Sequence, residues 1–247
     1  MPFTFSHIAA VLPIKEKFNK YFNFTGLVLG SLAPDFQYFL NFKPMGNLGH
    51  TLVGFIVLNL PLCFLVAFLF HKIIKKCFIL HMPTPFDRWY IHYAYTPWSL
   101  NSIKEIFIFI YSTLLGMLTH IVWDSFTHST GKFVLLFPQL RYNIFILNYA
   151  IPIYKLLQHG STLIGTFLLV IYMYKKRNLK RTPKFISLKN KLNYYIIIIL
   201  NILLFIFIGF FTRHITVHSK SIGSLIITFL NGLFVGCILA SINTKHY

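Results

Sequence analysis

A histidine, an aspartate and a second histidine stand four residues apart in the segment THIVWDSFTH, residues 119–128. The residues before it, 106–118, form an apolar run typical of a membrane-spanning helix. On an α-helix, residues four apart differ by about 40° around the axis and about 6 Å along it. His120, Asp124 and His128 would therefore line one face, provided that the helix continues past all three. Two imidazoles and a carboxylate on one face suit zinc or a similar divalent metal.

A structural interpretation of the same stretch also stands. Asp124 would then pair with a lysine, and the two histidines would cap the helix end at the membrane interface.

Three other polar residues lie beside apolar stretches: Asp35 in GSLAPDFQYF, His50 in GNLGHTLVGF and His159 in YKLLQHGSTLIG. Ionisable groups at a membrane edge are costly without partners, so they are candidate functional residues by default. The glycines around His50 would let the backbone approach a neighbour closely.

The composition indicates an integral membrane protein. The chain of 247 residues is 56% hydrophobic and only 11% charged, which is too apolar for a soluble domain of this length. Five runs are long enough, or nearly so, to cross about 30 Å of hydrocarbon as helices: 51–70, 106–122, 156–174, 194–211 and 222–242. We therefore predict an all-α fold, a polytopic transmembrane helical bundle of about five to six spans plus N-terminal half-helices.

The segment 133–153 is apolar but interrupted by prolines and an arginine, so we predict a re-entrant or interfacial segment there. The chain divides by composition into three parts. Residues 1–174 would form a membrane-embedded metal-site domain, 175–193 a basic cytoplasmic linker, and 194–247 a C-terminal two-helix membrane segment. The N-terminus lacks the basic region of a cleavable signal peptide.

The net charge of +18 is explained better by the positive-inside rule than by nucleic-acid binding, which we do not expect. The run 175–191 holds eight lysines and arginines between two spans, and its expected partner is the lipid bilayer's anionic inner leaflet. Richness in Phe, Ile, Lys, Asn and Tyr is typical of AT-rich bacterial genomes. The predicted location is the bacterial cytoplasmic (inner) membrane.

When the spans alternate with the basic segments inside, seven candidate ligands fall at one level, on the outer face. They are His7, Asp35, His50, His120, Asp124, His128 and His159. Hydroxyl residues that would support such ligands stand close to them in the sequence: Thr4, Ser6, Thr51, Ser125, Thr127 and Ser161. His214 and His218 would also lie outside, but with no carboxylate near them, and we interpret them as surface histidines.

Five motifs occur in order over roughly residues 1–175: MPFTFSHIAAVLP, GSLAPDFQYF, GHTLVGF, LTHIVWDSFTH and PIYKLLQHGSTLIG. They resemble an uncharacterised bacterial membrane family known as a domain of unknown function, which implies no activity. More distantly, the elements G-x-x-x-P-D, G-H-T and H-x-x-x-D are similar to those of bacterial inner-membrane proteins described as metal-dependent hydrolases.

The order of the seven candidates also resembles that of the ligands in zinc-dependent phospholipase C and the related single-strand nucleases. By that resemblance, a first metal would be held by His50, His120, Asp35 and Asp124. Asp124 would bridge to a second metal near His7, and His128 with His159 would hold a third.

Two departures from that pattern reduce the expected number of metals. Leu163 stands where the resemblance implies an acidic residue, and Met1 stands where it implies a tryptophan whose amine binds metal. We therefore expect a divalent metal cofactor, zinc, as one or two ions rather than three.

Three functions fit these observations. The first is a metal-dependent hydrolase in which Asp35 or Asp124 orients a water molecule or takes its proton, acting on a phosphoester such as a lipid. The second is a protein that binds or transports metal or protons, and the third is a structural membrane protein with a stabilising metal. Transporters usually place ionisable residues in mid-bilayer and show repeats of broken helices, so a cluster at one edge favours the hydrolase.

Overall fold

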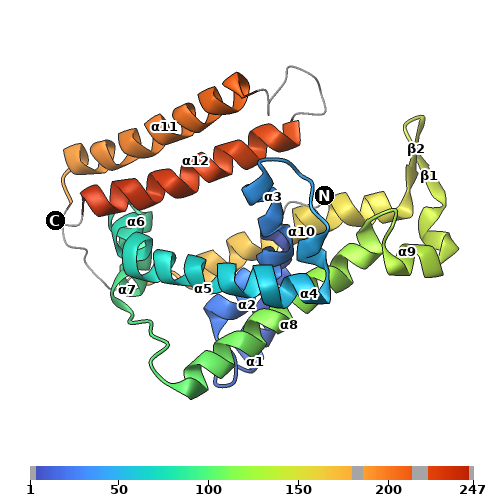
Figure 1. Cartoon of the computed structure of the whole chain (residues 1–247), viewed down its shortest axis with the longest axis horizontal. Coiled ribbons are helices and arrows are strands. Elements are labelled where there is room, and N and C mark those ends of the chain that lie inside the picture. Colours follow the sequence, from blue (N-terminus) through green and yellow to red (C-terminus); the bar gives the residue numbers. More distant parts are fainter. Residues whose placement is uncertain (1–3, 180–185, 213–221, 245–247) are drawn as a thin grey trace. The chain divides into compact units, whose positions relative to one another are not determined.

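The computed structural model describes residues 4–179, 186–212 and 222–244, and it is built almost entirely of helices (Figure 1). The α-helices are α1 (Ile8–Lys17), α2 (Phe24–Leu32), α3 (Phe36–Asn41), α4 (Leu52–Gly54), α5 (Leu60–Leu69), α6 (Lys75–His81), α7 (Phe86–Tyr95), α8 (Ile103–Thr127), α9 (Lys132–Leu136), α10 (Ile153–Lys175), α11 (Leu188–Phe211) and α12 (Ile222–Asn243). Short 3-10 helices are η1 (Thr4–His7), η2 (Ala33–Asp35), η3 (Leu48–His50) and η6 (Pro138–Arg141), and π-helical turns are η4 (Phe55–Asn59) and η5 (Phe70–Ile74). The predicted surface histidines His214 and His218 lie outside the described residues.

Within the described ranges, five helical stretches are long and apolar enough to cross a membrane. They are Leu52–His81, Ile103–Leu136, Ile153–Lys175, Leu188–Phe211 and Ile222–Asn243. The predicted all-α polytopic fold is therefore confirmed, and the chain is a multi-pass membrane protein. The first stretch differs from its prediction because the helix continues beyond residue 70 as η5 and α6. Lys72, Lys75 and Lys76, which follow the predicted run 51–70, thus stand on a helix, where the buried Lys75 donates to the Thr96 carbonyl at 2.7 Å.

The segment 133–153 begins with α9, the end of the candidate span Ile103–Leu136, and continues as η6 and a β-hairpin. Strand β1 (Asn143–Ile146) pairs antiparallel with β2 (Tyr149–Pro152), with Ile146 opposite Tyr149. The two residues between the strands have positive φ, as a tight hairpin turn requires. The strands are mostly exposed. That the segment is re-entrant or interfacial stays a prediction.

The contacts within the chain group it into two compact units. The first unit comprises residues 1–35, 48–63 and 100–175, and the second comprises 36–47, 64–99 and 176–247. All seven predicted ligands belong to the first unit. The predicted division into a metal-site domain, a basic linker and a C-terminal segment stays a prediction.

Small residues bring α2 and α8 together in the first unit (Figure 1). A Cβ atom added at Gly116 of α8 would meet the backbone nitrogen of Ser31 at 2.7 Å, which leaves no room for a side chain. The Asn23 side chain caps α2 by accepting from the Gly26 N–H at 3.0 Å, and the Asn23 N–H donates to the Ser112 hydroxyl at 2.9 Å. These contacts place the C-terminal end of α2 against the half of α8 that carries His120.

In the second unit, α11 and α12 lie side by side (Figure 1). Cβ atoms added at Gly232 and Gly236 of α12 would meet Ile202 and Ile198 of α11 at 2.8 and 3.0 Å, so the two backbones are close. A core of Ile74, Cys77, Tyr194, Ile198, Cys237 and Ala240 forms there. Asp87 of α7 and Lys191 of α11 form an ion pair at 2.5 Å.

Candidate metal centre

Short helices at the N-terminal side of the first unit deliver three of the predicted ligands to α8. His7 ends η1, Asp35 ends η2 and His50 ends η3. Asp35 and His50 come together because Gly49 lies directly against the Pro34 carbonyl, where a Cβ atom would collide. The close backbone approach that we predicted from the glycines around His50 is therefore present, between Gly49 and Pro34.

Four side-chain atoms form the first half of the cluster. The Nε2 atom of His120 lies 3.3 Å from Asp124 Oδ2 and 3.8 Å from Asp35 Oδ1. The Nε2 atom of His50 lies 3.8 Å from Asp124 Oδ2 and 3.7 Å from Asp35 Oδ1. Ligand atoms about 2.0–2.1 Å from a tetrahedral zinc are about 3.3–3.4 Å from one another, as tetrahedral geometry requires. These four separations agree with this spacing to about half an ångström.

The second carboxylate oxygen of Asp124 faces a different set of groups. Its Oδ1 atom lies 3.5 Å from His7 Nε2 and 3.5 Å from His128 Nδ1. The rings of His7 and His120 are stacked, with centroids 3.9 Å apart. Two triplets among the described residues have ligand atoms close enough to hold one ion each, His7 with His120 and Asp124, and Asp35 with His50 and His120. His120 belongs to both triplets, and Asp124 presents one oxygen to His50 and His120 and the other to His7.

Hydrogen bonds to the far side of two ligands direct their other atoms into the cluster. His120 Nδ1 lies 2.8 Å from the Ser31 carbonyl oxygen, which can only accept, so Nδ1 carries a proton, and in the neutral ring Nε2 then presents its lone pair. The Thr4 hydroxyl donates to Asp35 Oδ2 at 2.6 Å, leaving Oδ1 for the cluster. Such partners orient the ligands of metal sites and tune their basicity.

Several buried polar atoms of the cluster have no hydrogen-bond partner among the described residues. They are both ring nitrogens of His7, His120 Nε2 and Asp124 Oδ1. A buried polar atom without a partner costs about 1–3 kcal/mol, so a group of them in one place calls for an explanation. A divalent cation would satisfy three of the four, since His7 Nε2, His120 Nε2 and Asp124 Oδ1 all face the cluster. The donor set, nitrogen and carboxylate oxygen, fits zinc.

The electrostatics of the groups outside the spanning helices agree with this donor set. Burial, together with the nearby His120, lowers the pKa of His7 to about 3, so its imidazole is neutral near pH 7. Burial also raises the pKa of the Asp35 carboxyl above its usual value. A carboxylate in such a place is stabilised by a cation beside it, and a neutral imidazole is the form that binds metal.

His128 does not continue the stripe of α8. The helix ends at Thr127, before Gly131, and the His128 backbone is extended. Its Nδ1 atom lies 3.1 Å from the Asp124 carbonyl oxygen and 3.2 Å from the Thr127 hydroxyl. The prediction that His120, Asp124 and His128 all stand on one helix is therefore wrong, because α8 ends before His128. His128 lies beside Asp124 but outside both ligand triplets found in the described ranges.

His159 is an exposed residue of α10, and it also belongs to neither triplet among the described residues. Its role as a ligand stays a prediction. The structure thus brings together five of the seven predicted ligands, His7, Asp35, His50, His120 and Asp124, with His128 at the edge. The four ion-pair contacts of Asp124 in the described ranges are with His7, His50, His120 and His128, so the alternative with a lysine partner is not favoured.

Two supporting groups were not predicted from the sequence. One is the Ser31 carbonyl oxygen that faces His120. The other is Asn59, a fully buried residue in η4 whose amide donates to the Gly49 carbonyl at 2.7 Å and so fixes the turn before His50. A backbone carbonyl leaves no sequence signal, but an asparagine inside an apolar span does. Among the predicted hydroxyl residues, Thr4 contacts a ligand as expected, whereas Ser161 accepts from the Trp123 indole at 3.2 Å.

Comparison with known proteins identifies the family. The family described as "Domain of unknown function (DUF4184)" matches residues 1–242, so the chain belongs to it. This match includes the two C-terminal spans, beyond the roughly 175 residues over which the motifs were compared. No curated protein and no solved structure gave a significant match.

Proposed function

We propose that this member of the DUF4184 family is a membrane-bound, metal-dependent hydrolase of phosphoesters, including lipid phosphoesters. The observation that carries the proposal is the Asp124 carboxylate. One of its oxygens faces His50 and His120, and the other faces His7. A carboxylate between two sets of nitrogen ligands is typical of hydrolytic centres with one or two metals.

The cluster is accessible on one side only. The side chains of His50 and Asp124 are 25% and 18% exposed, whereas those of His7, Asp35 and His120 are 4% exposed or less. Water would therefore arrive at His50 and Asp124. Asp35, held by Thr4 and buried, is suited to hold a ligand position throughout the reaction.

The chemistry that a divalent metal supplies in such a centre is to acidify a water molecule and to polarise a phosphoryl oxygen. Asp124, the more exposed carboxylate, would orient the water or accept its proton. His120 stays in one tautomer because the Ser31 carbonyl holds its Nδ1 proton. His7, neutral and buried, contributes a nitrogen donor to the inner side of the cluster.

The metal we propose is zinc, as one or two ions, because the donors are imidazole nitrogen and carboxylate oxygen. The proposed location is the bacterial inner membrane with the cluster on the outer face. Its support is the basic run 175–191, which would contact the anionic inner leaflet on the other side.

The experiment that tests the proposal measures metal and turnover on the same purified full-length protein. We expect elemental analysis to find about one to two zinc ions per chain. Asp124→Asn should lose most of the metal, while Glu16→Gln, a change at an exposed carboxylate of α1, should retain it. The wild-type protein should hydrolyse bis(p-nitrophenyl) phosphate or a phospholipid, and a chelator should abolish this activity.

Two results would contradict the proposal at different levels. If the protein binds no metal even after reconstitution with zinc or manganese, the metal centre itself is wrong. If it binds metal through Asp124 but turns over no phosphomonoester, phosphodiester or phospholipid, the hydrolase is wrong, and a metal-binding, transport or structural protein remains.

A further inference from the structure

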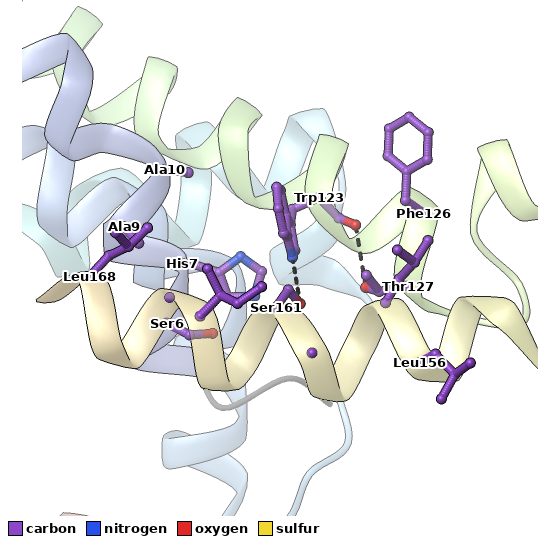
Figure 2. Close-up of a pocket in the computed structure, with 14 residues that line it drawn as sticks. Ser6, His7, Ala9, Ala10, Trp123, Phe126, Thr127, Leu156, Ser161 and Leu168 are labelled. Atoms are coloured by element: carbon purple, nitrogen blue, oxygen red, sulfur yellow. Dashed lines mark hydrogen bonds between the residues drawn. The ribbon is translucent and has the colours of Figure 1, made fainter. Parts of the chain in front are cut away.

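A cavity of about 550 Å³ lies in the first unit next to the candidate metal centre (Figure 2). Its walls come from α10, from the C-terminal half of α8, and from η1 and α1. Most of the lining is hydrocarbon or aromatic, as at Leu157, Ile164, Leu168 and Phe126, and none of the described residues in the lining is a lysine, arginine, aspartate or glutamate. The volume lies within the range of about 300–1,000 Å³ that is usual for small-molecule sites.

His7 connects this cavity with the His/Asp cluster. It lines the cavity, as Figure 2 shows, and its Nε2 atom is 3.5 Å from Asp124 Oδ1. On α8, Trp123 lines the cavity while the next residue, Asp124, belongs to the cluster. A molecule that fills the cavity and extends past His7 would therefore reach the cluster.

The cavity favours an apolar occupant. Its tryptophan indole donates to the Ser161 hydroxyl at 3.2 Å, and the Thr127 hydroxyl donates to the Trp123 carbonyl at 3.3 Å (Figure 2). These polar groups are thus used within the protein, and a polar occupant would leave its own groups unpaired at a cost.

The side of the cavity is open towards the surroundings of two spanning helices. Ile164, Leu168 and Leu157 of α10 are 62%, 46% and 41% exposed although they are aliphatic. Both α8 and α10 belong to stretches that are apolar and long enough to cross a membrane. The medium around these side chains is then lipid, which supplies hydrocarbon chains at high concentration.

We propose that this cavity binds a hydrocarbon chain of a lipid phosphoester, with the phosphate of the same molecule at the His7–Asp124 side of the cluster. The inference rests on the proposed function, because it names the substrate class of that hydrolase. The chain, acyl or isoprenoid, lies between α8 and α10, and His7 forms the boundary between the apolar and polar parts of the site.

Gly160 offers a way to fill the cavity without touching the cluster. It lines the cavity, and a Cβ atom added there would meet nothing within 4 Å. Gly160→Phe should therefore occupy the space of the chain, and Gly160→Leu is a smaller version of the same change. The matched control is Leu163→Phe, at a 73% exposed residue of the same helix that does not line the cavity.

Binding is measured without turnover through the fluorescence of Trp123. In full-length protein with Trp89→Phe and Trp98→Phe, Trp123 is the one tryptophan left of three. We expect dodecyl phosphate with a brominated chain to quench it, with Gly160→Phe and Gly160→Leu weakening binding by about tenfold or more, because the added side chain takes space that the hydrocarbon chain needs. Leu163→Phe should bind as the wild-type does. Equal binding by all the variants would overturn the proposed chain site.

Turnover separates failure of this inference from failure of the proposed function. With methyl and dodecyl p-nitrophenyl phosphate as substrates, Gly160→Phe should lower kcat/KM for the dodecyl ester by about tenfold or more while the methyl ester stays within about twofold. If both esters are hydrolysed and Gly160→Phe affects them equally, the chain site is wrong and the hydrolase stands. If neither is hydrolysed while Gly160→Phe still abolishes quenching, the hydrolase is wrong and the cavity is a lipid-binding site.

Discussion

Thr4 supports the metal centre through a single hydrogen bond, and its removal should be measurable. Its hydroxyl donates to Asp35 Oδ2 at 2.6 Å, and Asp35 is buried. A hydrogen bond to a charged group contributes about 1.5–3 kcal/mol. Loss of an outer partner of a metal ligand usually weakens metal binding by about 10–100-fold, which is about 1.4–2.7 kcal/mol. The two magnitudes agree, so we expect Thr4→Val to weaken zinc binding by about 10–100-fold.

The assay is competition for zinc between the metal-free full-length protein and a chelating dye, in detergent or nanodiscs. Thr4→Ser keeps the hydroxyl and should bind within about threefold of the wild-type protein. Thermal unfolding of the metal-free forms shows whether Thr4→Val acts only by destabilising the fold. Unchanged zinc affinity in Thr4→Val would refute the reasoning, as would an equal loss in Thr4→Ser, because the hydroxyl would then not be what matters.

Two further substitutions test how the site is built. Gly49→Ala should destabilise the protein by about 1–3 kcal/mol and weaken metal binding, because its Cβ would collide with the Pro34 carbonyl. The control is Gly160→Ala, whose added Cβ meets no atom of the described residues within 4 Å. Denaturant unfolding measures the stability of both variants. Retained stability and metal in Gly49→Ala would show that the contact is not needed. His159→Ala should leave zinc content unchanged, because His159 is exposed and lies outside both ligand triplets of the described residues; elemental analysis that finds less zinc in this variant would restore His159 as a ligand.

Much of the fold could be predicted from the sequence because a bilayer permits few structures. Apolar runs of sufficient length must form helices there, since their backbone groups have no other partner. The ends of the helices were less predictable. The first span runs to His81 because η5 and α6 continue the helix through the lysines, one of which finds a carbonyl partner. The hairpin at 143–152 could not be predicted from hydropathy, which does not distinguish exposed strands from an interfacial segment.

The candidate site was predictable to the extent that polar residues beside apolar runs had to find partners. Asp35, His50, His120 and Asp124 meet as expected, and so does His7, although a lone histidine is more often a surface residue. His128 differs because a helix end depends on local backbone preference, and the helix ends before it. The cavity beside His7 had no sequence signal, since its walls come from three separate segments of the chain.

The two ligand triplets compete for one atom, and this bears on how many ions the centre holds. Both triplets include His120, whose Nδ1 faces the Ser31 carbonyl, so only Nε2 remains for a metal. That atom lies 3.3 Å from Asp124 Oδ2 and 3.8 Å from Asp35 Oδ1. His50 Nε2 faces the same two oxygens. A second ion would then depend on His7 and the other oxygen of Asp124, with fewer protein ligands than the first. The geometry therefore favours one three-ligand position, of Asp35, His50 and His120 with Asp124 Oδ2 beside it, and a less complete position on the His7 side. The less complete position adjoins the apolar cavity, so the phosphate of the proposed lipid substrate would lie on the His7 side of the cluster.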